Sequence, residues 1–275
     1  MNNFLYKLRI LILRIIGYEK PYRVAIIKFL SLKFKTFRPH YETVLYESAR
    51  EATKLGYKEL SAIELGVAGG NGMIALEKCK NKIEKIFNIK IKLFGFDTGD
   101  GMPESKLTED ALFNWKKGDY KMNKDVLQKK LKSKIYFGLI EKTIDDFIND
   151  KPPQICAIFF DMDYYSSTNN FLNNIPKIKN LLLPRVLCYF DDIFTPNYYM
   201  GKYLGENKAI DEFNKKDSNF KLMNSIDHVS DYRFPLAKGS IFTLHNFEHK
   251  YYNNFIGEDL PESTDYGDKK TPNLF

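Results

Sequence analysis

The chain has 275 residues, of which 44% are hydrophobic and 28% are charged, and its net charge is +7. This composition is typical of a folded soluble protein, and it excludes a disordered chain and a protein with many membrane spans. The positive charge is concentrated at the start, because residues 1–38 contain nine Lys or Arg and a single acidic residue. The rest is close to neutral, and no recognisable nucleic-acid-binding module is present, so we expect no nucleic-acid partner.

The first stretch, MNNFLYKLRILILRIIGY, is both basic and apolar. Its apolar residues recur at three- and four-residue spacing, which predicts a helix with one apolar face. The stretch is too short to cross a bilayer and no cleavage site follows it, so we expect neither a membrane span nor a signal peptide. Two interpretations stay open: a peripheral helix that binds anionic lipid, and a helix that packs on the domain or across a homo-oligomer interface.

We expect three parts: a basic helical extension (1–55), a catalytic domain (56–250) and a polar tail (251–275). The three cysteines, Cys79, Cys156 and Cys188, lack the spacing of metal ligands. They are predicted to be reduced core residues in a reducing compartment, so the expected location is cytoplasmic, with peripheral contact to the inner face of the membrane if the first helix binds lipid.

Short apolar runs alternate with helical patterns from residue 60 onward, which predicts an α/β fold with a doubly wound, mostly parallel sheet. Five strands are expected at 61–66, 91–97, 134–139, 155–161 and 185–192, and two closing strands at 220–226 and 239–245. Ligands of such sheets bind beyond the carboxyl ends of the strands. Asp97, Asp161 and Asp191 each end a predicted strand, so we expect these carboxylates to converge there.

A glycine-rich turn, IELGVAGGNG, joins the first predicted strand to a helix. Glycines at such a turn let a ligand approach the backbone N–H groups. The spacing is neither GxGxxG nor that of a P-loop. Asp97 is suited to accept hydrogen bonds from two ribose hydroxyls, although DTGDGMP also fits a turn in which Asp97 is only a cap.

The pattern of Glu64, Gly66, Gly70 and the strand-ending Asp97 resembles the nucleoside-binding half of class I methyltransferases, which bind S-adenosylmethionine. The resemblance implies a seven-stranded Rossmann-like methyltransferase sheet. It also implies that the cofactor is bound by Glu64, Gly66, Ala68, Gly70, Asn71, Asp97 and Thr98.

Four aspartates follow the fourth and fifth predicted strands, in FFDMDYYSST and YFDDI. Asp161 and Asp163 share a face if the strand continues through them. Asp191 and Asp192 face one ion only if the chain turns there. Carboxylates without nearby His or Cys favour a hard cation such as Mg²⁺, although single acids at such positions can also cap the next helices.

The ordered motifs ELGVAGGNG, GFDTGDGMPE, FFDMDYYSST, YFDDI and KAIDEF resemble the macrocin O-methyltransferase family, whose members methylate sugar hydroxyls. The resemblance covers about residues 60–245, and it implies a Mg²⁺ ion held by Asp163, Asp191 and Asp192, with Asp161 as general base. A sugar hydroxyl is a poor nucleophile, and binding to Mg²⁺ makes its deprotonation feasible.

This sequence departs from the family before the fifth strand, where LLLPRVLCYF replaces a glycine-rich turn, and in its basic N-terminus. Because of these departures, the resemblance does not identify the individual acceptor. We expect a sugar of an antibiotic, of a surface polysaccharide or of a nucleotide-linked precursor. Two other functions stay open: a metal-dependent oxygenase of the cephalosporin hydroxylase-like branch, and a non-catalytic membrane-associated binding protein. Trp115 and its neighbours are expected to form either a lid over the acceptor or a packed surface helix.

Overall fold

The computed structural model describes residues 38–194, 201–216, 219–224 and 240–257. The expected N-terminal helix and residues 258–275 of the expected tail lie outside the described residues, so lipid binding and homo-oligomer formation stay predictions. In the part of the chain that is described, no helix has the length and apolar character needed to cross a membrane.

Seven strands form one sheet in the order β3-β2-β1-β4-β5-β7-β6. They are β1 (Glu59–Leu65), β2 (Lys90–Asp97), β3 (Lys134–Phe137), β4 (Gln154–Phe160), β5 (Leu182–Phe190), β6 (Phe220–Asn224) and β7 (Ile241–Asn246). The first five are parallel, and β7 runs antiparallel to both β5 and β6. All seven predicted strands are present, which confirms the predicted α/β fold with a doubly wound, mostly parallel, Rossmann-like sheet.

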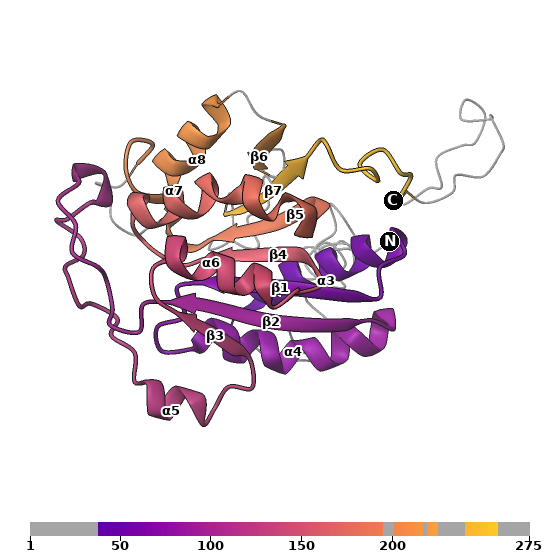
Figure 1. Ribbon diagram of the computed structural model, residues 1–275, viewed down its shortest axis with the longest axis horizontal. Coiled ribbons are helices and arrows are strands. Elements are labelled where there is room, and N and C mark those ends of the chain that lie inside the picture. Colours follow the sequence, from indigo (N-terminus) through magenta and orange to yellow (C-terminus); the bar gives the residue numbers. More distant parts are fainter. Residues whose placement is uncertain (1–37, 195–200, 217–218, 225–239, 258–275) are drawn as a thin grey trace, which may run out of the picture.

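Helices cover both faces of the sheet (Figure 1). The α-helices are α3 (Pro39–Lys54), α4 (Asn71–Phe87), α5 (Lys124–Gln128), α6 (Ile140–Asn149), α7 (Tyr165–Asn173) and α8 (Gly205–Lys215). Short 3₁₀ helices are η1 (Thr108–Asp110), η2 (Ile175–Leu181) and η3 (Asp191–Phe194). Helix α3 packs beside α4, while α6, α7 and α8 contact one another in a second row.

Helix α3 belongs to the core of this domain, although it lies before residue 55 in the predicted extension. Its buried face lies against β4 and β5. Five of its apolar side chains are fully buried: Tyr41, Val44, Leu45, Ala49 and Ala52. The three cysteines are free and buried, as predicted. The 1–55 boundary stays a prediction, to which the structure adds that residues 39–54 pack on the sheet.

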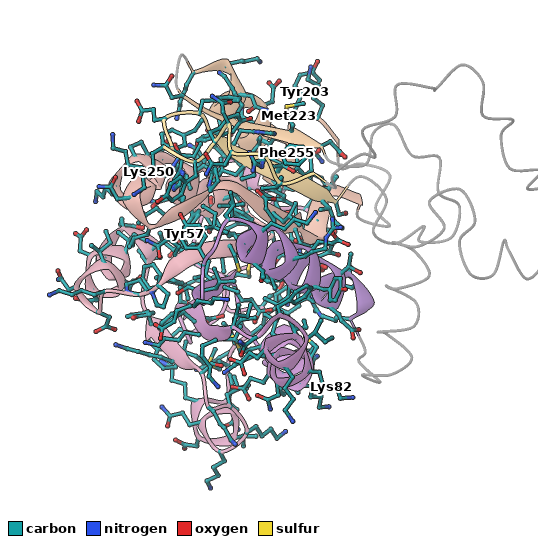
Figure 2. The ribbon with its side chains drawn as sticks, turned by 90° about the vertical axis from the view of Figure 1, so that its right-hand side faces the viewer. Tyr57, Lys82, Tyr203, Met223, Lys250 and Phe255 are labelled. Carbon is teal, nitrogen blue, oxygen red and sulfur yellow. The ribbon has the colours of Figure 1, made fainter. Side chains whose placement is uncertain are left out.

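The described part of the C-terminal segment, residues 247–257, lies at the side of the sheet where the parallel strands begin. Figure 2 looks onto this side, with Tyr57, Lys250 and Phe255 labelled. Lys54 donates to the carbonyl of Ile256 at 2.7 Å, and Arg185 donates to that of Tyr252 at 2.6 Å. These bonds fasten the segment to the end of α3 and to β5, away from the carboxyl ends of the strands.

Candidate active site

A cavity of about 570 Å³ lies at the carboxyl ends of β1, β2, β4 and β5. In Figure 1 the head of β2 points toward this side, where the long connection between β2 and β3 loops out. The volume is within the range of small-molecule sites. Nearly all the predicted site residues line it: Glu64, Gly66, Ala68, Asn71, Asp97, Thr98, Asp161, Asp163, Asp191 and Asp192. Gly70 is not among the lining residues and is the N-cap of α4.

The side chain of Asp97 accepts hydrogen bonds from the backbone of the glycine-rich turn. Its Oδ2 accepts the backbone N–H groups of Val67 and Ala68, each at 2.8 Å, and its Oδ1 accepts that of Gly99 at 2.6 Å. A carboxylate has about four acceptor sites, so three of them are already used by backbone groups. Asp97 therefore shapes the turn, and one acceptor site is left for the ribose hydroxyls that the sequence predicted it would bind.

Gly66 connects the glycine-rich turn to the end of β4. Its φ is +85°, which favours glycine, and a Cβ there would lie 1.8 Å from the carbonyl oxygen of Asp161. The amide of Gly66 donates to Phe96 at 2.8 Å, and the amide of Asp161 donates to Leu65 at 2.9 Å. Only a residue without a side chain fits this contact, so the turn and the acidic strand end are fixed relative to each other.

Glu64 is buried under the same turn. A Cβ at Gly72 would lie 1.7 Å from its Oε1, so glycine at that position makes room for the carboxyl group. Burial, and then the charge of Asp161, raise the pKa of Glu64 well above its ordinary value, although the positive charge of Arg38 partly offsets them. Its Oε2 is buried without a partner, which leaves an acceptor, or a donor when protonated, for a ligand in the cavity.

Asp161 and Asp191 lie on either side of the guanidinium of Arg38. Arg38 Nη1 is 3.0 Å from Oδ2 of Asp161 and 3.9 Å from Oδ1 of Asp191. The hydroxyl of Tyr41 also donates to Asp161 Oδ2, at 3.4 Å. Burial and then the charge of Asp191 raise the pKa of Asp161 to about 6, against the opposing effect of Arg38. A carboxyl group with this pKa is suited to accept a proton near neutral pH.

Asp163 and Asp192 form a second carboxyl pair. Strand β4 ends at Phe160, and Asp163 has a φ of +60°, so the strand does not continue through Asp161 and Asp163 as the shared-face interpretation required. The predicted turn at Asp191 is present as η3. Burial and then the charge of Asp161 raise the pKa of Asp163 to about 7, and burial and then the charge of Asp163 raise the pKa of Asp192 well above its ordinary value.

Glu206, at the start of α8, contacts the backbone of this pair. Its Oε2 accepts the backbone N–H of Asp192 at 3.0 Å, and its side chain is buried. Burial and the charge of Asp192 raise the pKa of Glu206 well above its ordinary value. The sequence analysis missed Glu206, because nothing in the local sequence GENKAIDEF indicates that this residue contacts the end of β5.

The aspartates match a hard divalent cation in the chemistry of their oxygens. Asp192 Oδ2 is buried and has no hydrogen-bond partner, as expected of a ligand atom that lacks its ion. As the side chains stand, however, no three His, Cys, Asp or Glu groups in the described ranges are close enough together to hold one ion. The residues therefore fit Mg²⁺ in kind, and its binding requires a rearrangement of these carboxylates.

The connection between β2 and β3 forms a wall of the cavity with a small core of its own. Trp115 packs edge-on against Tyr164 at 6.4 Å, together with Met102 and Ala111. Trp115 lies between two turns and outside any helix, so the surface-helix alternative is wrong. Asp110 ties the wall to α7, because it accepts the backbone N–H and the hydroxyl of Ser166, both at 2.7 Å.

Helix α3 supplies residues that the sequence analysis did not assign to the site. Arg38 and Tyr41 reach Asp161, while His40 stacks on Tyr189 at 4.6 Å. Tyr189 in turn donates its hydroxyl to Asp191 Oδ1 at 2.9 Å. Burial lowers the pKa of His40 to about 4, so this ring is neutral near neutral pH and serves to pack.

Comparisons with known proteins give structural likeness only. No protein-family model and no curated protein matches the sequence. Among solved structures, apo CalS11, a TDP-rhamnose 3′-O-methyltransferase of calicheamicin biosynthesis, aligns at 17% identity over 74% of this chain and 77% of its own, with a TM-score of 0.43.

Two further structures align at similar levels. MNMC2 from Aquifex aeolicus has 13% identity over 74% of this chain and 56% of its own, with a TM-score of 0.37. The plantazolicin methyltransferase BamL, in complex with a substrate analog and SAH, has 11% identity over 81% of this chain and 91% of its own, with a TM-score of 0.38. These scores are too low to carry a functional argument, so the assignment of function depends on the cavity itself.

Proposed function

We propose that this protein transfers a methyl group from S-adenosylmethionine to a sugar hydroxyl, with Mg²⁺ at the carboxylate cluster. The observation that carries the proposal is one cavity in which a glycine-rich turn, held open by Asp97, faces the carboxylates of Asp161, Asp163, Asp191 and Asp192. This combination supplies the first backbone N–H groups of α4 and the remaining acceptor site of Asp97 for a nucleoside, and oxygen ligands for a hard cation. The ordered sequence motifs of the macrocin family support the choice of a sugar as acceptor.

Asp161 is the proposed general base. Arg38 and Tyr41 both donate to its Oδ2, which leaves Oδ1 to take the proton of the acceptor hydroxyl. Asp163, Asp191 and Asp192 are the proposed holders of Mg²⁺, which when bound would polarise the hydroxyl and stabilise the alkoxide. Glu64 and the glycine-rich turn would orient the cofactor, and the wall around Trp115 would exclude water from the reacting atoms.

Calorimetric titration with S-adenosylhomocysteine, with and without Mg²⁺, tests the cofactor class. We expect micromolar affinity in both conditions, because the turn and Asp97 are separate from the carboxylate pairs. Absence of binding in both conditions would overturn the proposal. The oxygenase alternative would then be examined, although no histidine of the described ranges lines the cavity, as iron-dependent oxygenases commonly require.

Replacing Asp97 with Ala should weaken S-adenosylhomocysteine binding by about 10- to 100-fold. The change removes a charged acceptor from the backbone N–H groups of Val67 and Ala68, and such bonds contribute about 1.5–3 kcal/mol each. Calorimetry measures the affinity. The matched control is Asp100→Asn, three residues after Asp97, because the Asp100 side chain is 80% exposed. Equal affinities of the two variants would contradict this role of Asp97.

A further inference from the structure

Arg38 lies between the carboxylates of two neighbouring strand ends. The same nitrogen, Nη1, is 3.0 Å from Asp161 and 3.9 Å from Asp191. Among the residues that the structure describes, Arg38 is the one Lys or Arg that lines the cavity. The charge of Asp191 raises the pKa of Asp161, and the guanidinium supplies a positive charge that opposes this repulsion.

The position of the guanidinium is fixed by packing as well as by charge. Its central carbon lies 4.8 Å from the centre of the Tyr41 ring, and Tyr41 is fully buried and stacked on Phe159 at 4.4 Å. The same oxygen of Asp191 that faces Arg38, Oδ1, accepts the hydroxyl of Tyr189 at 2.9 Å. An Arg with this support keeps its place with little loss of side-chain freedom, unlike an exposed surface ion pair.

We propose that Arg38 competes with a divalent cation for the carboxylates of Asp161 and Asp191. The inference rests on the proposed function, because Asp191 is one of the proposed ligands of Mg²⁺. The orphaned, buried oxygen of Asp192 supports a cation site beside this ion pair. A fixed positive charge 3.9 Å from Asp191 opposes the approach of a second cation, so Arg38 sets the affinity of the cluster for the ion.

Mn²⁺ binding to the full chain tests the proposal without a known acceptor, because free Mn²⁺ is measured directly by electron paramagnetic resonance. We expect Arg38→Gln to bind Mn²⁺ about tenfold more tightly than the wild type, since even a screened unit charge at this distance changes affinity by that order. Arg38→Lys keeps the charge and should bind Mn²⁺ like the wild type. Unchanged or weaker binding by Arg38→Gln would overturn the proposal, as would absence of binding in all three proteins.

Controls separate this outcome from damage to the fold and from failure of the proposed function. Arg50→Gln removes a cation of the same helix that pairs with Glu47 and does not line the cavity, so it should leave Mn²⁺ affinity unchanged. A destabilised protein would lose Mn²⁺ and S-adenosylhomocysteine together, whereas we expect Arg38→Gln to gain affinity for one and keep the other. If the wild type binds no S-adenosylhomocysteine, the methyltransferase proposal fails, but the Mn²⁺ comparison still decides the role of Arg38.

Discussion

Asp163→Asn should abolish tight Mn²⁺ binding and lower methyl transfer by about 10³-fold, while the affinity for S-adenosylhomocysteine stays within about twofold. The expected loss is large because Asp163 is a proposed ligand of the ion and lies beside the proposed base. The groups that act on its charge are Asp161, Asp191 and Asp192 and not groups of the glycine-rich turn, so cofactor binding should be spared. Electron paramagnetic resonance with Mn²⁺, calorimetry and a methyl-transfer assay on a panel of sugars measure the three quantities.

Asn is the informative replacement at this position because it preserves the local structure. Asp163 has a φ of +60°, a conformation that Asn tolerates better than most residues. Asp145→Asn is the control, because the Asp145 side chain is 66% exposed on α6 and pairs only loosely with Lys177 at 3.8 Å. Full methyl transfer by Asp163→Asn, or by the wild type in the presence of a chelator, would remove the metal from the mechanism.

Gly66→Ala should destabilise the protein by about 4 kcal/mol or more and abolish S-adenosylhomocysteine binding. The added Cβ would lie 1.8 Å from the Asp161 carbonyl oxygen, and the backbone at a φ of +85° is itself strained for alanine. The clash cannot be relieved by rotating a side chain, because the other partner is backbone. Thermal and urea unfolding measure the loss of stability, and calorimetry measures binding.

Gly69→Ala, in the same turn, is the matched control for stability. A Cβ at Gly69 would meet nothing within 4 Å, so we expect its free energy of unfolding to stay within about 0.5 kcal/mol of the wild type. Similar stabilities of the two variants would mean that the turn and the end of β4 move apart easily. That result would contradict the inference that the glycine-rich turn and Asp161 are fixed relative to each other.

The sheet was predictable because its signals are local. Continuous apolar runs mark strands covered on both faces, and all seven lie where the runs predicted them. The convergence of Asp97, Asp161 and Asp191 followed from the parallel direction of β2, β4 and β5. The turn at Asp191 was also predictable, from the requirement that adjacent aspartates face one side.

The contacts that organise the site were not predictable, because they join distant parts of the sequence. Arg38 and Asp161 are 123 positions apart, and Asp97 and Val67 are 30 apart. The left-handed conformation at Asp163 has no sequence signal either, since most Asp residues adopt ordinary φ values. The roles of the predicted site residues stay predictions, whereas their meeting in one cavity is an observation.

Helix α3 also bears on where this chain can be cut. Its N-cap residue Arg38 and its Tyr41 contact the carboxylate of Asp161. Its last residue, Lys54, donates to the carbonyl of Ile256. A recombinant fragment started at residue 56 would expose the rings of Phe159 and Tyr189 to water and leave Asp161 and Asp191 without their cation. The shortest fragment that preserves both the core and the carboxylate cluster therefore starts at or before Arg38.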